Sequence, residues 1–442
     1  MSRLIPRHSS IHGAILSAML SATVVGAAVL AAPTAAHAAD ADAVDDTYTV
    51  ATGAVLGVDA GGGLLANDLG IDVGLGLLIS LETPPAHGTL SDIGLDGSFT
   101  YTPLDGWAGA DTFSYCLKLP VPLALCAGSS ATVTITTTPV IERISGVDRY
   151  ATSASVSAQK FTTGVSTVYV ASGEVFPDAL SASAAAGAEG APVLLVQKNA
   201  IPLSVDTELR RLEPDHIVLL GGVNTVSAAV ETALGAYGAL DVERVDGADR
   251  FAVSAAVSAR VFGPLRPVVY IASGEVFPDA LSGSAAAGRL GGPVLLVQKD
   301  GVPGAVATEL ARLKPLALVV LGGTNTISDA TRTQLDGIAG LVSTRIAGAD
   351  RYATSATVSQ KTFLPLVDRT VYVASGEVFP DALSGSAAAI NAHAPVLLVT
   401  RDGIPTATAG ELDRLNPTRI VVLGGLNTIS ATTYDQLATH LG

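Results

Sequence analysis

The sequence predicts a mainly parallel, doubly wound α/β fold repeated three times, preceded by a small all-β sandwich. The stretch Ala-Ser-Gly-Glu-Val-Phe-Pro-Asp-Ala-Leu-Ser stands at 171–181 and recurs unchanged at 272–282 and 374–384. Landmarks around it return at a spacing of 101 residues, so units of 140–240, 241–341 and 342–442 reach the last residue. Strand-like and helix-like stretches alternate within each unit, whereas residues 39–138 show only short alternating runs. Self-similarity at a fixed period indicates one structural unit used several times.

Residues 1–38 have the features of a secretory signal peptide. Arg3 and Arg7 form a positive start, residues 15–32 are apolar and uncharged, and Ala36-His37-Ala38 is a small-x-small cleavage site. We therefore expect a secreted chain, with an uncleaved membrane anchor as the less favoured alternative. The later apolar runs are short and broken by Gly, Pro or charge, so we expect no membrane association after cleavage.

Residues 39–138 predict an antiparallel β-sandwich. Runs rich in Thr, Val and Tyr, such as 99–103 and 131–136, alternate with turn residues, and Asp96-Gly97 predicts a hairpin turn. The two cysteines, Cys116 and Cys126, are ten residues apart. In an oxidising compartment we expect them to form a structural disulfide.

The first unit illustrates the elements expected in all three. Asp148 N-caps a helix that runs to about Phe161, and Pro177 takes the first position of a second, Ala-rich helix. The near-continuous apolar run at 193–197 is typical of a strand covered on both faces. Further strands are expected at 167–171 and 216–220, and further helices at 206–212 and after Ser227.

Two retained loops in each unit follow a strand and precede a helix, which places both at the carboxyl edge of a parallel sheet. Doubly wound folds bind ligands at this edge, and helix N-termini there favour anions. The loop carboxylates are also explained as a helix-entry device without a ligand, and this interpretation is favoured. The candidate ligand residues are Ser172, Glu174, Asp178, Asn224, Ser273, Glu275, Asp279, Asn325, Ser375, Glu377, Asp381 and Asn427.

An Asp-Arg pair precedes the first helix of each unit. Arg149, Arg250 and Arg351 either form basic spots that face an acidic polymer or make ion pairs between neighbouring units. The structural role is favoured, because each arginine stands beside its own aspartate and is partly neutralised by it.

Catalysis finds little support in the repeated positions. After residue 38 the histidines are His87, His216, His393 and His440, and none is kept between units, so neither a Ser-His triad nor a histidine metal site is repeated. We expect no enzyme activity, no cofactor and no metal site. Repetition is instead what a multivalent binder needs, because linked weak sites add up to avidity.

The charge balance limits the partners. The formal net charge is −15, and it becomes −17 when Arg3 and Arg7 are removed. Nucleic acid is not expected as a partner, since its binding requires Lys and Arg to neutralise phosphate. Contact with an anionic polymer would have to be local, at Arg side chains or helix N-termini.

The repeated motifs, among them Gly-x-Asp-Arg-Tyr/Phe-Ala, Phe-Pro-Asp-Ala-Leu-Ser, Pro-Val-Leu-Leu-Val and Leu-Gly-Gly-x-Asn-Thr-Ile/Val-Ser, resemble the type 2 cell-wall-binding repeat. This repeat occurs in threes on secreted proteins of Gram-positive bacteria, and the resemblance covers 140–442. It implies flavodoxin-like modules packed around a pseudo-threefold axis, and non-covalent retention on the wall, often through an anionic glycopolymer. It also implicates a hydrophobic triplet, which here begins with Val instead of Ile and contains Leu194, Leu195, Leu295, Leu296, Leu397 and Leu398.

Residues 39–138 resemble the cadherin-like or immunoglobulin-like domains of bacterial adhesins. Asp45-Asp46-Thr-Tyr, Leu65-Ala-Asn-Asp68 and Asp111-Thr-Phe-Ser-Tyr carry the resemblance. Such domains often have an acidic run after the Asn-Asp pair, and this chain lacks it. Calcium binding is therefore disfavoured, because Ca²⁺ requires six to eight oxygen ligands.

These observations predict a secreted, non-enzymatic surface protein. Residues 140–442 would hold it non-covalently on a wall glycopolymer or on peptidoglycan, and residues 39–138 would present an adhesin-like domain to a protein or cell-surface partner. One alternative is a wall hydrolase or a modifier of one. A second is a soluble secreted protein without affinity for the wall.

Overall fold

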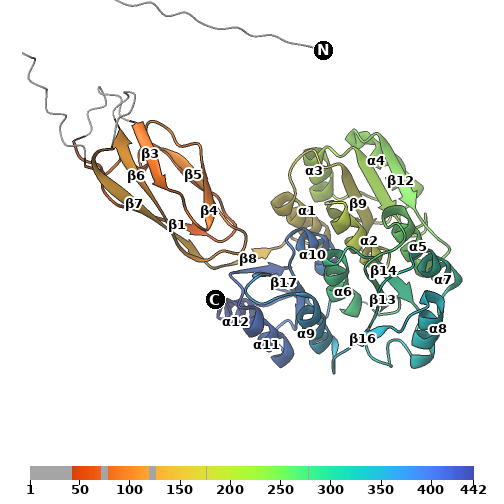
Figure 1. Cartoon of the computed structure of the whole chain (residues 1–442). Coiled ribbons are helices and arrows are strands. Elements are labelled where there is room, and N and C mark those ends of the chain that lie inside the picture. The colour runs from red at the N-terminus through yellow and green to blue at the C-terminus, as the bar shows by residue number, and fades with distance from the viewer. Residues whose placement is uncertain (1–41, 71–77, 119–125, 176, 277) are drawn as a thin grey trace, which may run out of the picture.

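The structure is a computed structural model, and it describes residues 42–70, 78–118, 126–175, 177–276 and 278–442. The predicted signal peptide at 1–38 lies outside the described residues. An elongated β domain stands beside three α/β modules that are grouped around central helices (Figure 1). Among the described residues, no helix is both long enough and apolar enough to cross a membrane.

The β domain is a sandwich of two sheets, with strand orders β1-β7-β6-β3 and β2-β5-β4. Phe99, Tyr101, Phe113 and Tyr115 are buried between the sheets. β1 pairs with β7 in parallel, so the prediction of a purely antiparallel sandwich is wrong at this edge. No hairpin joins these two strands, which leaves their relative direction free. The strands are β1 (Asp46–Ala51), β2 (Leu56–Val58), β3 (Leu78–Thr83), β4 (Gly88–Ser91), β5 (Phe99–Pro103), β6 (Gly109–Lys118) and β7 (Cys126–Thr138).

A disulfide joins Cys116 in β6 to Cys126 at the start of β7, with the two Cα atoms 5.6 Å apart. The predicted hairpin lies between β4 and β5, where Gly97 takes a positive φ of 86°. The Asp96 carboxylate accepts hydrogen bonds from the backbone N–H and the hydroxyl of Ser98. These local contacts are the ones expected of a turn residue followed by glycine.

Each α/β module is built on a four-stranded parallel sheet, and the strand orders are β10-β9-β11-β12, β14-β13-β15-β16 and β18-β17-β19-β8. This 2-1-3-4 order is that of a flavodoxin-like sheet. The strands of the first two sheets are β9 (Thr167–Ser172), β10 (Val193–Val196), β11 (His216–Leu220), β12 (Asp241–Val245), β13 (Val269–Ser273), β14 (Val294–Val297), β15 (Leu318–Leu321) and β16 (Thr344–Ile346). Those of the third are β17 (Thr370–Ser375), β18 (Val396–Val399), β19 (Arg419–Leu423) and β8 (Val140–Ile144).

The helices begin close to where the sequence predicts them. The Asp148 carboxylate accepts a hydrogen bond from the Ala151 N–H and so caps the first helix, and Pro177 begins the second. Helices of the first unit are α1 (Arg149–Lys160), α2 (Pro177–Ala188), α3 (Leu203–Leu212) and α4 (Ala228–Leu234). Those of the second are α5 (Arg250–Val261), α6 (Pro278–Arg289), α7 (Gly304–Leu313) and α8 (Asp329–Ala339). Those of the third are α9 (Arg351–Thr362), α10 (Pro380–Asn391), α11 (Thr406–Leu415) and α12 (Ala431–Ala438).

The first strand of each sequence unit belongs to the sheet of another unit. β12 and β16 open the second and third units, but they pair with β11 and β15 of the units before them. β8 opens the first unit and pairs with β19 of the last, from Val140 opposite Arg419 to Ile144 opposite Leu423. The three sheets are therefore linked in a closed cycle, and residues 140–144 close it.

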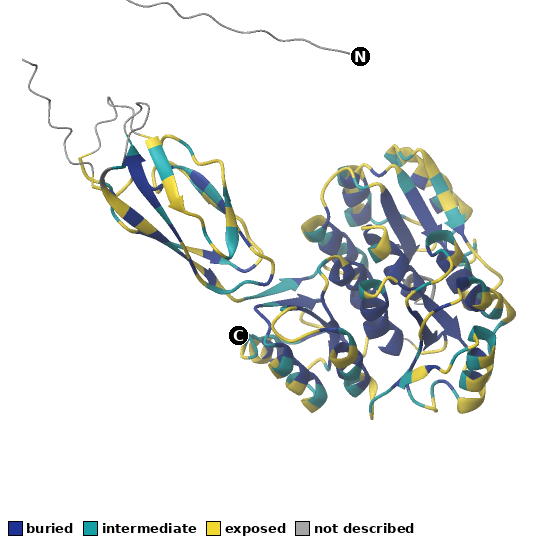
Figure 2. Ribbon diagram, viewed as in Figure 1, coloured by how far each residue is buried: buried dark blue, intermediate teal, exposed yellow. Residues whose placement is uncertain are grey.

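The helices α2, α6 and α10 pack against one another at the centre of the assembly (Figure 2). A buried serine on each helix donates a hydrogen bond to a main-chain carbonyl of a neighbouring helix: Ser183 to Leu383, Ser284 to Leu180 and Ser386 to Leu281. Small side chains allow this close approach. The cyclic pattern of bonds is the pseudo-threefold arrangement that the sequence resemblance implies.

Only Pro139 separates β7 of the β domain from β8 of the third sheet. The Thr418 hydroxyl donates a hydrogen bond of 2.9 Å to the Gly106 carbonyl across this junction. The β domain is thus attached at the place where the cycle of modules closes.

Candidate functional site

Three equivalent pockets lie where successive units meet, and we call them the junction pockets. Each is lined by the two retained loops of one unit and by the Gly-x-Asp-Arg segment that opens the next. Their volumes are about 260 Å³ between units one and two, 360 Å³ between units two and three, and 600 Å³ between units three and one. The carboxyl edge of the sheet, where the sequence predicts a site, is thus the place where the pockets open.

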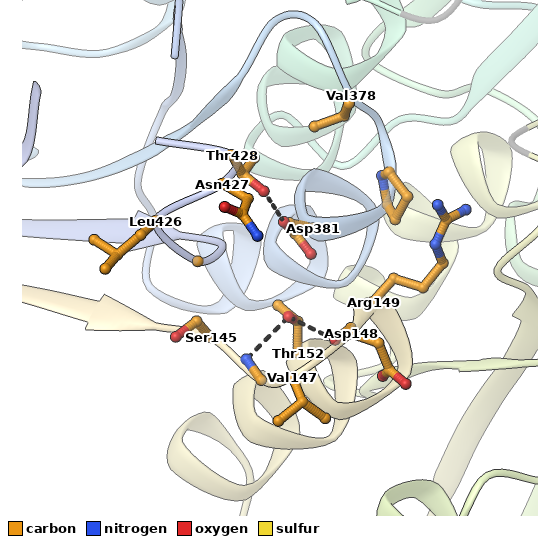
Figure 3. A pocket seen from close by; sticks show the side chains of 13 residues that line it. Ser145, Val147, Asp148, Arg149, Thr152, Val378, Asp381, Leu426, Asn427 and Thr428 are labelled. Atoms are coloured by element: carbon orange, nitrogen blue, oxygen red, sulfur yellow. Dashed lines mark hydrogen bonds between the residues drawn. The ribbon is translucent and has the colours of Figure 1, made fainter. Parts of the chain in front are cut away.

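The structure brings several of the predicted residues together in these pockets, always across a unit boundary. Asp381 and Asn427 meet Arg149 in the largest of the three junction pockets (Figure 3). Asp279 and Asn325 meet Arg351 in the second, and Asn224 meets Arg250 in the third. The side chain of Asp178 lies outside the described residues.

The aspartates at the bottom of two pockets are buried carboxylates. Asp279 and Asp381 are each 8% exposed. Burial raises the pKa of both, and hydrogen bonds with nearby threonines and the charge of the adjacent arginine act in the opposite direction. The Thr428 hydroxyl donates to the Asp381 carboxylate at 3.4 Å, as Figure 3 shows.

The second glycine loop is shaped to receive these carboxylates. Gly322 and Gly424 have positive φ values of 88° and 103°. A Cβ atom at these positions would lie 2.3 Å from the Asp279 carboxylate and 2.4 Å from the Asp381 carboxylate. Glycine is therefore required both by the backbone conformation and by the close approach of the aspartate.

The hydrogen bonds found among the described residues connect these arginines to loops of their own unit, and Arg149 also lies over the Phe379 ring of unit three, 5.8 Å from its centroid. Arg149, Arg250 and Arg351 each donate from Nη1 to the carbonyl of the glycine in their own Ala-Ser-Gly loop, at 2.5, 2.8 and 2.5 Å. The arginines that stand six residues earlier in each unit make further hydrogen bonds between units. Arg143 donates to the Gly424 carbonyl at 2.7 Å, and Arg244 and Arg345 do the same with Gly221 and Gly322.

The predicted serines and glutamates do not line the junction pockets. Ser172, Ser273 and Ser375 are buried, and each hydroxyl accepts a hydrogen bond from the N–H of the glutamate two residues later. Their role in this structure is to hold the loop that precedes the second helix. Glu174, Glu275 and Glu377 are exposed beside the pockets.

The six leucines of the hydrophobic triplet do not face solvent. Leu194, Leu195, Leu295, Leu296, Leu397 and Leu398 are all 0% exposed. They lie in β10, β14 and β18, which helices cover on both faces. The resemblance implies that these leucines contact a polymer directly. Their burial contradicts this expectation, because the leucines pack in the core of each module.

Several pocket residues were not among the sequence candidates. Thr152 and Thr354 lie beside the buried aspartates, but Val253 fills the same position in unit two, so the threonine is not a repeated signal. Val147, 99% exposed, and Leu426, 60% exposed, give the largest pocket an apolar rim. Ala and Thr or Val take these positions in the other units.

This arrangement suits the binding of a hydroxyl-rich ligand. Buried carboxylate, threonine hydroxyl, asparagine amide and guanidinium groups offer both donors and acceptors within one concave surface. Carboxylates balance the arginines, so the pockets are not built as strong anion sites. Among the described residues, the lining of the junction pockets includes no histidine.

The fold is thus a cycle of three parallel α/β modules with a similar pocket at each junction. The chain belongs to the family of cell wall binding domain 2 (CWB2) proteins, whose model matches residues 143–231, 244–332 and 345–434. Residues 32–138 match the bacterial Ig domain. Both resemblances inferred from the sequence are thereby confirmed.

Two relatives come from Bacillus subtilis (strain 168). The chain is 27% identical over 297 residues to N-acetylmuramoyl-L-alanine amidase LytC, which covers 67% of this chain and 58% of that protein. It is 28% identical over 299 residues to the amidase enhancer, which covers 68% of this chain and 40% of that protein. The chain therefore spans less than two thirds of the length of either relative.

Two solved structures share the fold. Cwp6 from Clostridium difficile matches 91% of this chain and 68% of its own, with a TM-score of 0.66 and 19% identity. Cwp8 from the same organism matches 90% of this chain and 68% of its own, with a TM-score of 0.63 and 21% identity. At this level of identity the likeness concerns the fold alone.

Proposed function

We propose that this chain is a secreted, non-enzymatic surface protein that its three CWB2 repeats hold non-covalently on the cell wall. The observation that carries the proposal is the recurrence of one pocket at all three unit junctions. Secretion rests on the signal-peptide features of residues 1–38. The Ig domain, attached through Pro139, would extend from the wall-bound modules and present its surface to a protein or cell-surface partner.

The three pockets explain how weak contacts become firm retention. A wall polymer repeats its own unit, so occupation of one pocket raises the effective concentration of neighbouring units at the other two. The ligand class we propose is a polyhydroxylated saccharide segment of a wall glycopolymer or of peptidoglycan. Asp279 and Asp381 would accept hydrogen bonds from its hydroxyl groups, and Asn325 and Asn427 would contact it at the pocket rims.

The test is co-sedimentation of the full chain with isolated walls, before and after removal of secondary polymers. Loss of binding after this removal would identify the glycopolymer as the ligand, whereas unchanged binding would identify peptidoglycan. Full recovery in the supernatant with untreated walls would refute the proposal.

Variants at the pocket rims test the role of the junctions. Asn224, Asn325 and Asn427 are exposed loop residues, so replacing each by alanine should leave the fold intact. We expect each single variant to weaken wall binding several-fold and the triple variant to weaken it by about 100-fold or more. Asn199→Ala, at an exposed loop position outside the pockets, is the matched control. A triple variant that binds as well as the control would place the binding surface elsewhere.

A second candidate function is that of a wall hydrolase or a modifier of one. The observation that favours it is the similarity to an amidase and to an amidase enhancer. Incubation of the purified chain with walls, alone and together with an amidase, separates the two functions. Release of muropeptides by the chain alone would support a hydrolase, and faster release by the added amidase would support a modifier. Sedimentation with no effect on either rate supports the binding protein.

A further inference from the structure

A second type of cavity, of about 630 Å³, lies at the other end of the central helices. The junction pockets lie near the N-termini of these helices, whereas this cavity is lined by the C-terminal residues of α2, α6 and α10, including Gly187, Gly288 and Ile390. We call it the axial cavity. A smaller cavity of about 180 Å³ at the junction with the Ig domain shares Arg289 and His393 with it.

Several residues that line the axial cavity depart from the repeat pattern, among them the apolar Ile390 and the acidic Glu189, and three others carry a cationic or titratable group. Arg266 stands four residues before the strand tyrosine Tyr270, where the other units have Val165 and Asp368. Arg289 replaces Ala188 and Asn391, counted from the proline that begins each helix. His393 stands where the other units have glycine. Divergence of the units has thus placed Arg266, Arg289 and His393 in one cavity, together with the carboxylate of Glu189.

His393 takes a backbone conformation for which the other two units use glycine. Its φ is 51°, in the left-handed region, and the equivalent Gly190 and Gly291 have φ values of 65° and 72°. A side chain in this conformation is unfavourable relative to glycine. The two other units keep glycine, so the imidazole is present against the local preference.

The arginines of the cavity differ in how far their charges are compensated. Arg260 is held by Glu189 at 2.9 Å and by Glu243 at 2.8 Å. In the part of the chain that the structure describes, Arg289 has one ion pair, with Asp368 at 3.3 Å. The Nε of Arg266 is buried, and it has no hydrogen-bond partner among the described residues. Burying a guanidinium N–H without a partner is unfavourable.

The ends of the helices explain only part of this pattern. Cations near helix C-termini interact favourably with the partial negative charge there, and Arg289 is the last residue of α6. Arg266 lies in the loop that precedes β13, outside any helix, so the same reason does not apply to it.

From these observations we propose that the axial cavity binds one phosphate-bearing ligand of saccharide size per chain. Guanidinium groups are the preferred partners of phosphate oxygens, and the volume is that of an ordinary ligand site. Arg266 and Arg289 would contact the phosphate, and His393 would donate a hydrogen bond from its ring. This site is independent of the junction pockets and of the proposed wall binding.

Isothermal titration of the full chain tests the proposal. The probes are inorganic phosphate and N-acetylglucosamine 1-phosphate, with N-acetylglucosamine and sodium chloride of equal ionic strength as controls. We expect saturable binding of one phosphorylated ligand per chain and none of the neutral sugar. Tighter binding of the sugar phosphate than of inorganic phosphate would identify a saccharide-bound source, whereas equal affinities would identify the free anion. Absence of saturable, phosphate-specific binding would overturn the proposal.

Variants separate this role from a structural one. Arg266→Gln should weaken phosphate binding at least tenfold, whereas Arg210→Gln, an exposed arginine paired with Asp206 on α3, should leave it unchanged. His393→Gly restores the glycine of the other units and relieves the left-handed backbone. It should therefore raise the melting temperature of the free chain while weakening phosphate binding. Unchanged phosphate affinity in both Arg266→Gln and His393→Gly would refute the assignment.

Discussion

The packing at the pseudo-threefold axis depends on one residue that differs between the units. Ile390 of α10 is 5% exposed, and its equivalents on α2 and α6 are Gly187 and Gly288. A Cβ atom added at Gly187 would lie 2.6 Å from Ile390 Cδ1 and 2.7 Å from Ile390 Cβ. Since the Cβ of Ile390 is fixed by its own backbone, a change of rotamer cannot relieve this contact.

The sign of Gly187→Ala therefore depends on what occupies position 390. Alanine in place of glycine in a helix gains up to about 1 kcal/mol. Overpacking at the axis costs about 1–3 kcal/mol, so in the natural chain we expect a net loss of about 1–2 kcal/mol. Ile390→Gly alone removes this Cβ, opens a cavity and places a glycine in a helix, so it should cost about 3–5 kcal/mol. In that background the added methyl group has room, and Gly187→Ala should become stabilising by about 1 kcal/mol or more.

The assay is a double-mutant cycle measured by urea denaturation of the full chain, with Gly304→Ala as a control. Gly304 is a helical glycine whose added Cβ would meet no atom within 4 Å. We expect a coupling energy of about 2–3 kcal/mol between positions 187 and 390 and none between 304 and 390. If Gly187→Ala is stabilising in the natural chain, or if its effect is the same in both backgrounds, the account of the axis is wrong.

Three further predictions follow from single sites. Burial and the neighbouring Asp68 raise the pKa of Asp46 from 3.8 to about 6, so the folded state binds more protons than the unfolded one at acidic pH, and stability falls as pH rises through 6. Asp46→Asn should remove this loss. With allowance for solvent screening, it should stabilise the Ig domain by about 1 kcal/mol at pH 7.5 and have little effect at pH 4. Equal thermal denaturation curves of the variant and the natural chain at pH 7.5 would contradict this. Gly424→Ala should destabilise by about 2 kcal/mol and weaken wall binding, because the new methyl group meets the Asp381 carboxylate at a backbone φ of 103°; an unchanged urea midpoint would argue against it. A chain that begins at residue 145 leaves one edge of β19 unpaired and should melt at lower temperature, or aggregate more, than a chain that begins at 140, and indistinguishable melting curves would show that β8 does not close the cycle.

Local features of the fold were predictable because they depend on residues close together in the chain. Asp148 at a helix N-cap, Pro177 at a first helical position and the apolar strand at 193–196 are recognised from the chemistry of a few neighbouring residues. The threefold repetition is visible in the sequence for the same reason. The same apolar run predicts that Leu194 and Leu195 are buried, and they are. The ligand contact that the resemblance implies for them is not compatible with this burial.

The composition of the candidate site was only half predictable. The two retained loops were found, but their partner is the Arg149 segment of a different unit, and nothing in the spacing of 101 residues shows which loops meet. That pairing follows from strand exchange: β8 joins β19 because the open edge of the last sheet needs a partner, and this closure places Asp148 and Arg149 beside Asp381.

The axis and the axial cavity depend on contacts between units that are about 100 residues or more apart. Ile390 opposite Gly187, and Arg266 near His393, are ordinary residues in their local sequence, and each is informative only as a departure from the repeat. Short-range propensity thus determined the modules and their order, whereas the assembly of the modules decided which side chains share a pocket, because packing brings together residues whose separation along the chain carries no signal.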